Sequence, residues 1–136
     1  MILVSVLVVD DLEFWREFVS SALEKEASVE IVCKASNGLQ AIQMAEKLRP
    51  MVVLLDISMP GLNGLEAAGW IRKLSPDTKI IFLSEEFDRD IVEAAINIGA
   101  WGYVLKSEAA RDLITAIYCV AQGKKFVSRV LLRHGV

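Results

Sequence analysis

Short apolar runs alternate with longer stretches of helical spacing along this chain, and this alternation limits its fold more than any other feature. The runs are rich in β-branched residues and occupy positions 5–9, 31–35, 51–55, 79–83 and 102–105. Strands this short and this apolar are typical of a parallel sheet that is buried on both faces. Between the first two runs, apolar residues follow the spacing of one helix face, at Trp15, Phe18, Val19, Ala22 and Leu23.

Five β–α units in a row predict a doubly wound α/β fold. Parallel neighbours need crossover connections, and right-handed crossovers place helices on both faces of the sheet. We therefore expect a flavodoxin-like (βα)5 fold with a five-stranded parallel sheet of order 2-1-3-4-5. A chain of 136 residues is long enough for one such domain, whereas an eight-fold barrel needs about 250 residues.

Charge and hydropathy argue against nucleic-acid binding, membrane insertion and secretion. The net charge is −3 and all 18 acidic residues precede position 123, so the body has no basic footprint for nucleic acid. The longest apolar runs are far shorter than the roughly 18 residues that cross a bilayer, and the start lacks the positively charged region of a signal peptide. Cys33 and Cys119 lie in apolar segments, as buried, reduced thiols do. We expect a cytoplasmic protein with no membrane contact and no direct binding to nucleic acid.

Polar side chains follow four of the five expected strands. Asp10 and Asp11 follow the first strand, Asp56 the third, Ser84 the fourth and Lys106 the fifth. In an open α/β sheet, ligands bind beyond these carboxyl ends, near the point where the strand order reverses. Three carboxylates gathered there need a cation, and a few carboxylates completed by water and a phosphate suit Mg²⁺ (or Mn²⁺).

The same residues predict phosphoryl-transfer chemistry. Lys106 would supply a fixed positive charge, and Ser84 a hydrogen-bond donor, for an anionic group held between them. Asp56 is the natural nucleophile, since no histidine, cysteine or activated serine is available. Taken alone, all of these residues except Asp56 have a simpler explanation: Asp10 and Asp11 could cap the first helix. Likewise, Lys106 could be a solvated lysine and Ser84 a turn residue. Their joint occurrence at one edge of the sheet favours a shared site.

Longer motifs around these residues resemble the receiver domain of two-component response regulators, over residues 5–122. The matching pieces are Val-Leu-Val-Val-Asp10-Asp11, Leu-Leu-Asp56-Ile-Ser-Met-Pro-Gly-Leu-Asn-Gly64, Ile-Ile-Phe-Leu-Ser84 and Gly99-Ala-Trp-Gly-Tyr-Val-Leu-Lys106. The resemblance implies that Asp56 accepts a phosphoryl group from a histidine kinase or a phosphotransfer protein. It also implies a switch that catalyses only its own phosphorylation and dephosphorylation, and not an enzyme with a separate substrate.

The resemblance assigns roles to the metal-binding residues. Asp11 and Asp56 would ligate Mg²⁺ together with the backbone carbonyl of Ser58, and Asp10 would act mainly through metal-bound water.

The resemblance also assigns the residues of the switch. Ser84 would hydrogen-bond the phosphoryl oxygens, and Lys106 would pair with the acyl phosphate. Tyr103 resembles the family's switch aromatic, which turns inward when Ser84 is drawn toward the phosphoryl group. The alternative for Tyr103 is an ordinary half-buried strand residue.

Details near the C-terminus point to a subfamily. The pattern Gly-Ala-x-Gly-Tyr-x-Leu-Lys without a following proline, and a helix ending Ala-Gln-Gly123, are similar to the NarL/FixJ type with a LuxR-type helix-turn-helix. We expect a receiver domain at residues 1–122 and, at residues 123–136, a C-terminal tail that is frayed or begins a linker. The linker would lead to a DNA-binding domain that is absent from this chain and regulates transcription. A homodimer on phosphorylation is compatible with this type, and a stand-alone receiver is the alternative.

Some positions depart from the usual receiver pattern. Glu85 replaces a residue that is usually small, and its carboxylate could repel small anionic phosphodonors. Trp101 replaces a small or polar residue and would either be exposed for a contact or pack on the fourth helix.

Two rival functions remain open. One is a degenerate receiver that acts only as a protein-interaction module. The other is an aspartyl-phosphate phosphatase of the haloacid-dehalogenase type, which needs a second acid where this chain has Ser58.

Overall fold

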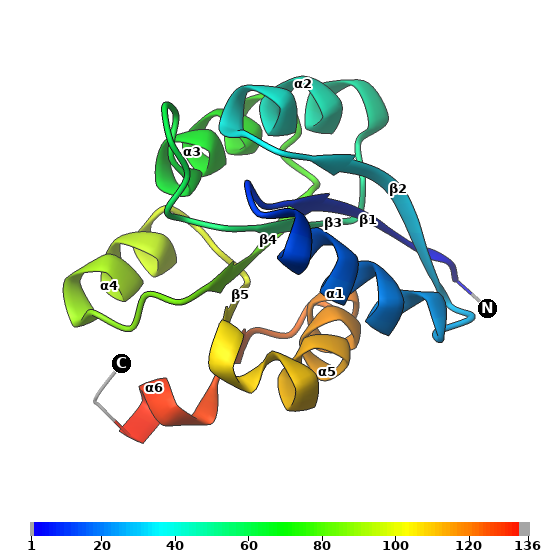
Figure 1. The fold of residues 1–136 in the computed structure, drawn as a ribbon. Coiled ribbons are helices and arrows are strands. Elements are labelled where there is room, and N and C mark those ends of the chain that lie inside the picture. The colour runs from blue at the N-terminus through cyan, green and yellow to red at the C-terminus, as the bar shows by residue number, and fades with distance from the viewer. Residues whose placement is uncertain (1, 134–136) are drawn as a thin grey trace.

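The computed structural model describes residues 2–133 and has helices on both faces of a sheet (Figure 1). Within these residues the sheet is parallel and has six strands in the order β2-β1-β3-β4-β5-β6. The strands are β1 (Val4–Val9), β2 (Val29–Ala35), β3 (Val52–Leu55), β4 (Lys79–Ser84), β5 (Gly102–Leu105) and β6 (Phe126–Val127). The helices are α1 (Glu13–Glu24), α2 (Gly38–Leu48), α3 (Gly64–Leu74), α4 (Arg89–Asn97), α5 (Ala109–Ala121) and α6 (Arg129–Arg133). A 3₁₀ turn at Lys106–Glu108 leads from β5 into α5.

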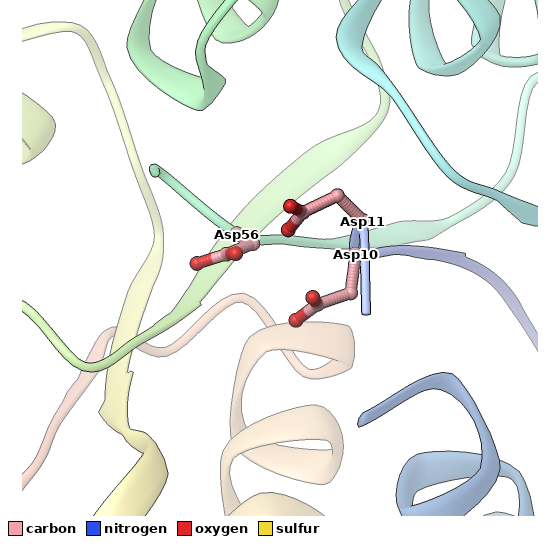
Figure 2. Close-up of side chains that lie close together, drawn as sticks. All are labelled: Asp10, Asp11 and Asp56. Carbon is pink, nitrogen blue, oxygen red and sulfur yellow. The ribbon is translucent and has the colours of Figure 1, made fainter. Parts of the chain in front are cut away.

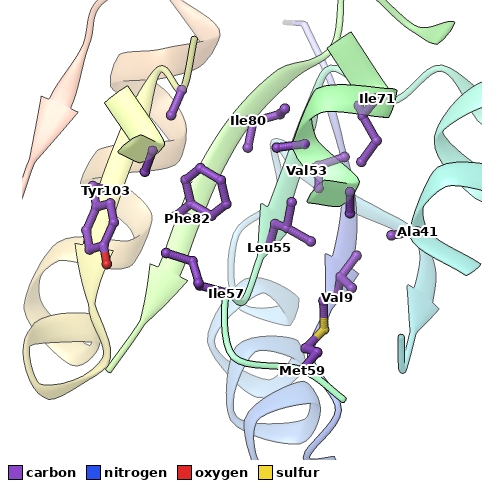
Figure 3. Close-up of a cluster of buried hydrophobic side chains, with 14 of the residues drawn as sticks. Val9, Ala41, Val53, Leu55, Ile57, Met59, Ile71, Ile80, Phe82 and Tyr103 are labelled. Carbon is purple, nitrogen blue, oxygen red and sulfur yellow. The ribbon is translucent and has the colours of Figure 1, made fainter. Parts of the chain in front are cut away.

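The apolar strands pack against helices on both faces of the sheet. Because side chains alternate along a strand, Val6 and Val8 of β1 belong to the core with α1 and α5, whereas Leu7 and Val9 belong to the core with α2, α3 and α4. Figure 3 shows the second core, in which residues of β3, β4 and α3 meet. The doubly wound arrangement predicted from the alternation is therefore confirmed.

The expected number of strands is wrong, because the sheet has six strands and not five. The tail after Gly123 was expected to fray or to begin a linker, but Phe126 and Val127 form β6 and pair in parallel with Gly102 and Tyr103 of β5. Two strand residues are too few to stand out as a periodic pattern in a sequence. The last three positions of the tail, 134–136, lie outside the described residues.

A buried serine anchors the tail beside β5. Ser128 is fully buried, and its hydroxyl accepts a hydrogen bond from the Leu105 amide (3.0 Å) and donates one to Asp112 of α5 (3.2 Å). Its own amide donates to the Tyr103 carbonyl (2.9 Å). Leu131 of α6 is buried as well and joins the core on the α4 side. The tail is thus bound to the strand that ends just before Lys106.

Three other expectations concern exposure and packing. Cys33 and Cys119 are free thiols, but both are half-buried and not buried. Trp101 packs with the α1–α5 core and not on α4, and its ring lies 5.2 Å from the ammonium of Lys79 and 5.6 Å from that of Lys125. Among residues 2–133, no helix has the length and apolar character needed to cross a membrane.

Candidate functional site

Three carboxylates meet at the carboxyl edge of the sheet (Figure 2). Asp10 and Asp11 follow β1, and Asp56 follows β3, which is the neighbour of β1 in the sheet. One oxygen from each of the three carboxylates lies within 4.8 Å of the others. Asp10 and Asp56 are buried, and Asp11 is half-buried. The cluster therefore follows directly from the adjacency of two strands that end at the same level.

Hydrogen bonds fix the position of Asp10. Its Oδ1 accepts from the Leu12 amide (3.0 Å), and its carbonyl accepts from Nη1 of Arg16 (2.8 Å). Arg16 lies on α1, so this bond ties the end of β1 to the helix that follows. Neither aspartate caps that helix, because its N-cap is Leu12 and no side chain caps it. The helix-cap explanation of the Asp10–Asp11 pair is wrong.

Lys106 brings a cation into the carboxylate cluster. Its Nζ lies 2.8 Å from Oδ2 of Asp10 and 3.4 Å from Oδ2 of Asp56, and its side chain is only 4% exposed. On another side, the ammonium lies over the ring of Trp15, 4.8 Å from the centroid. A buried ammonium needs such partners to offset its desolvation. The alternative of a solvated lysine is therefore wrong.

The Asp56 carboxyl is unusually hard to ionise. Burial, and then the nearby Asp10 carboxylate, raise its pKa from 3.8 to about 6, against the opposing effects of Lys106 and the Ile57 amide. That amide donates to Oδ1 of Asp56 (2.8 Å). The positive charge and hydrogen bonds around ionised Asp56 thus do not fully offset its burial, as is typical of a carboxylate in a ligand-binding site.

The raised pKa of Asp56 predicts a pH-dependent stability of the metal-free protein. A pKa raised in the folded state contributes stability that is fully present below pH 3.8 and is lost as the pH rises through about 6. In EDTA, Asp56→Asn should therefore raise the free energy of unfolding at pH 8 by about 2 kcal/mol, after allowance for solvent screening. Urea unfolding at pH 8 and pH 5 measures this, and the gain should be smaller at pH 5. An equal gain at both values would contradict the shift.

The loop after Asp56 is shaped by a glycine. The Gly64 amide donates to the Ile57 carbonyl (2.8 Å), which closes the loop before α3. A Cβ at position 64 would overlap the carbonyl oxygen of Asp56, so only glycine fits without moving that residue. A capping box between Asn63 and Glu66 then starts α3. The phosphoacceptor candidate is therefore held by a tight turn.

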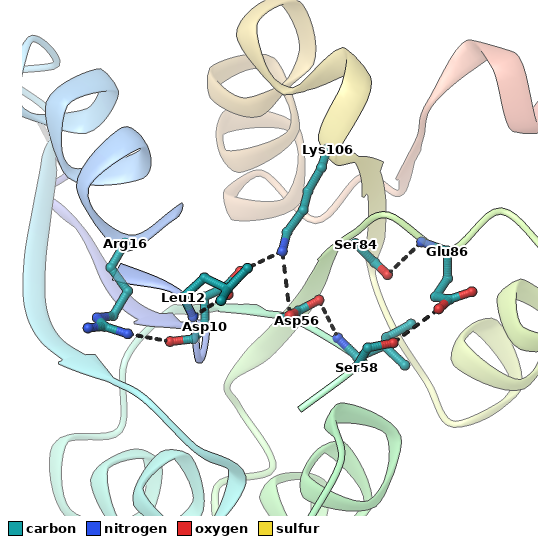
Figure 4. Close-up of polar contacts among 9 residues, drawn as sticks. Asp10, Leu12, Arg16, Asp56, Ser58, Ser84, Glu86 and Lys106 are labelled. Atoms are coloured by element: carbon teal, nitrogen blue, oxygen red, sulfur yellow. Dashed lines mark hydrogen bonds and ion pairs between the residues drawn. The ribbon is translucent and has the colours of Figure 1, made fainter. Parts of the chain in front are cut away.

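Glu86 links three of the predicted residues, and Figure 4 shows it with two of them, Ser58 and Ser84. Its amide donates to the Ser84 hydroxyl (3.0 Å), its carbonyl accepts from the Tyr103 hydroxyl (2.6 Å), and its carboxylate accepts from the Ser58 hydroxyl (3.0 Å). Two of the three bonds involve backbone atoms, which no sequence motif can reveal. Glu86 therefore connects Ser58, which stands two positions after Asp56, with Ser84 and Tyr103.

Tyr103 is fully enclosed. It is 1% exposed, and its ring lies 6.1 Å from that of Phe82 between their centroids. Burial raises the pKa of Tyr103 to about 12, although a hydrogen bond with Ser84 opposes the rise. The phenol thus stays protonated and keeps donating to Glu86. The alternative of a half-buried strand residue is wrong.

The structure gathers most of the predicted residues but not all of them. Asp10, Asp56 and Lys106 are in direct contact, whereas Ser84 contacts Glu86 and no described hydrogen bond joins it to Asp56. Within residues 2–133, Asp11 has no described ion pair or hydrogen bond. The Ser84 hydroxyl accepts a hydrogen bond from the Glu86 amide, as a turn residue would. Ser84 is also completely buried.

Fold and site together define a doubly wound α/β protein with an acidic, lysine-containing pocket at the strand ends. The family model described as the response regulator receiver domain matches residues 6–118. The chain belongs to this family.

Relatives and solved structures agree with the family. The chain is 36% identical over 124 residues to the transcriptional regulatory protein DegU of Brevibacillus brevis, covering 91% of this chain and 52% of DegU. It is 35% identical over 127 residues to the nitrate/nitrite response regulator NarL of Escherichia coli K12, covering 93% of this chain and 59% of NarL. The isolated receiver domain of RcsB from Salmonella enterica serovar Typhimurium, solved with the phosphomimetic BeF3⁻, superposes with a TM-score of 0.90. Its identity is 28%, with 96% of this chain and 97% of that one covered.

These matches assign the chain to a class of signalling domain. The chain is a receiver domain homologous to transcriptional regulators of two-component systems. It spans only about half to three fifths of the length of DegU and NarL. What the longer proteins do as a whole is therefore a matter for proposal here.

Proposed function

We propose that Asp56 accepts a phosphoryl group from a histidine kinase or a phosphotransfer protein, and that this switches the output surface of the domain. The observation that carries the proposal is the pair of contacts that Lys106 makes with Asp10 and Asp56. They hold a cation beside a buried carboxylate whose pKa lies at about 6, so that it is ionised at neutral pH and still lacks partners.

Several residues have separate roles in the proposed phosphoryl transfer. An oxygen of Asp56 attacks phosphorus, while the Ile57 amide orients the carboxylate through its bond to Oδ1. Lys106 pairs with the charge on the transferring group, and Ser84 donates to a phosphoryl oxygen. Such fixed charges and dipoles stabilise the transition state because they need no reorganisation.

The carboxylate cluster fits a divalent cation. Three carboxylates against one ammonium leave an excess of negative charge, and hard oxygen ligands within 4.8 Å of one another suit Mg²⁺ (or Mn²⁺). Asp11 and Asp56, with the backbone carbonyl of Ser58, would hold the ion directly, and Asp10 through water. When bound, the ion supplies positive charge that offsets the charge of the phosphoryl oxygens.

The contacts of Glu86 suggest how the switch works. Ser84 can engage a phosphoryl oxygen only by loosening its bonds to its present neighbours, among them the Glu86 amide. Glu86 also holds the Tyr103 hydroxyl, so a shift of this loop alters the balance between positions of Tyr103. The affected surface comprises α4, β5 and α5.

We further propose a role for the whole protein. The receiver occupies residues 1–122, and the following segment connects it to a DNA-binding domain through which phosphorylation regulates transcription. The protein acts in the cytoplasm, forms a homodimer on phosphorylation, and leaves DNA contact to that other domain. Support comes from the names and lengths of DegU and NarL, and from a related RcsB structure described as a complex with DNA.

A mass measurement tests the phosphoacceptor function. The protein is incubated with phosphoramidate in Mg²⁺ or in EDTA, and its intact mass is recorded before and after mild base. We expect one phosphoryl group in Mg²⁺ only, removed by base as an acyl phosphate should be. No adduct with any small donor or kinase would leave a degenerate receiver, and turnover of unrelated phosphate esters would favour a phosphatase.

Removal of Asp11 should weaken metal binding without harming the fold. Asp11 is half-buried and has no described partner, so Asp11→Asn removes a ligand charge and breaks no contact. We expect the affinity for Mg²⁺ to fall at least tenfold by calorimetric titration, since one ligand charge is lost. Thermal unfolding in EDTA should match the wild type within error. Unchanged affinity would place the metal elsewhere.

A further inference from the structure

A pocket of about 430 Å³ opens beside Lys106, on the edge of the sheet that carries the carboxylates. It is lined by Trp15, Glu85, Phe87, Leu105, Lys106 and Ser107. These residues come from α1, from the loop between β4 and α4, and from the end of β5 and the turn after it. Lys106 lines this pocket and also contacts Asp56, so a ligand in the pocket would lie next to a direct partner of the phosphoacceptor.

Two of the six lining residues are aromatic, and both have exposed surface. Trp15 is half-buried, with its ring next to the Lys106 ammonium. Phe87 is 72% exposed, an unusual state for a large aromatic side chain at a polar site. Two such rings favour a flat, unsaturated group between or against them.

Charge is unevenly distributed in the pocket. Lys106 provides a cation at the end near Asp56, whereas Glu85 provides an exposed carboxylate. A ligand with an anionic phosphoryl group and a neutral or cationic remainder matches this distribution. A ligand whose remainder is a carboxylate does not, because Glu85 would repel it.

We propose that this pocket receives the imidazole ring of the phosphohistidine donor and selects imidazole as the leaving group. The inference rests on the proposed function of Asp56 and names a substrate subsite of that reaction. As an oxygen of Asp56 forms its bond to phosphorus, the phosphorus–nitrogen bond of the donor breaks and its electron pair stays on that ring nitrogen. The other ring nitrogen keeps its proton, so a neutral imidazole remains against Trp15 and Phe87.

Trp15 contacts Lys106 as well, so the test must separate two roles. A Trp15 that only positions Lys106 would affect every phosphodonor alike. A Trp15 that contacts the leaving group would affect only donors whose leaving group is large enough to reach it. Phosphoramidate releases ammonia and phosphoimidazole releases imidazole, so the ratio of their rates isolates the contact with the ring.

The experiment compares phosphorylation rates with phosphoimidazole and phosphoramidate, in Mg²⁺ and by intact mass, for the wild type, Trp15→Leu, Phe87→Leu and Trp15→Phe. We expect the imidazole-to-ammonia rate ratio to fall about tenfold in both leucine variants. It should stay close to the wild-type value in Trp15→Phe, which keeps an aromatic ring. The control Trp70→Leu removes an exposed tryptophan on α3 and should leave both rates unchanged.

The charge of the pocket is tested with a third donor. Acetyl phosphate releases a carboxylate, so Glu85→Gln should raise its rate relative to phosphoimidazole. A fall of that relative rate would contradict the role of Glu85.

Other outcomes would overturn the inference in distinguishable ways. An unchanged imidazole-to-ammonia ratio in Phe87→Leu and Trp15→Leu would show that the ring does not enter the pocket. Equal slowing of both donors in Trp15→Leu would make it a positioning residue for Lys106 alone. If the wild type took phosphate from neither donor, the proposed function would fail, and the subsite with it. Phe87 is so exposed that its variant should fold normally, which keeps the test decisive.

Discussion

Asp56→Asn should reduce phosphate incorporation to background with every donor. The substitution keeps the size of the side chain and replaces the attacking carboxylate oxygen with an amide, which is not a nucleophile under these conditions. Asp10 is bonded to the Leu12 amide and to Lys106, which leaves it unable to take over. Intact mass after incubation with phosphoramidate and Mg²⁺ gives the measurement. The same variant is expected to be more stable than the wild type in EDTA, so loss of incorporation cannot be attributed to unfolding.

A matched aspartate serves as the control. Asp77 is exposed and precedes β4, at the opposite end of the sheet strands from the carboxylate cluster. Asp77→Asn should incorporate phosphate like the wild type. If Asp56→Asn still gained a base-labile phosphate, another carboxylate would have to be the acceptor.

Lys106→Met should destabilise the metal-free protein by about 3 kcal/mol at pH 8, because it leaves two buried carboxylates without their cation. Methionine fills most of the space of the lysine stem, so the loss arises chiefly from the charge. The Asp10 and Asp56 carboxylates are 5% and 6% exposed and would then face one another without a counter-charge. Urea unfolding in EDTA measures the loss.

Two further conditions distinguish this cause from poor packing. Mg²⁺ should restore more stability to Lys106→Met than to the wild type, because it replaces the missing positive charge. At pH 5 the loss should shrink, since Asp56 is then largely protonated. Lys47→Met, at an exposed position in the last turn of α2, should leave stability within about 0.5 kcal/mol of the wild type. A loss independent of pH and metal would point to packing.

The sheet and the carboxylate cluster were predictable from the sequence because both follow from local patterns. Five apolar runs gave strands whose observed limits differ by two residues at most from the predicted ones. Parallel strands end at one edge, so the residues after them had to meet, and Asp10, Asp56 and Lys106 do so. The roles of these residues in phosphoryl transfer remain predictions.

Other features depended on contacts that have no local pattern. Glu86 is bonded to Ser84 and Tyr103 through its backbone, so the identity of its side chain does not reveal these two bonds. Trp15 was predicted only as part of a helix face, yet its ring contacts the ammonium of Lys106, which lies far away along the chain. The strand β6 is two residues long and forms only because β5 offers it an unpaired edge. Long-range geometry decides such contacts.

The position of Ser128 determines how force or motion would pass between the tail and β5. Its hydroxyl and amide bond β5 on both sides of Val104, two residues before Lys106. Tension or torque applied to the chain beyond this serine would therefore be transmitted into β5 through its hydroxyl and amide, and into α5 through the bond from that hydroxyl to Asp112. Motion of Tyr103 or Lys106 would travel outward by the same route. The tail is therefore hydrogen-bonded directly to the strand that leads into Lys106.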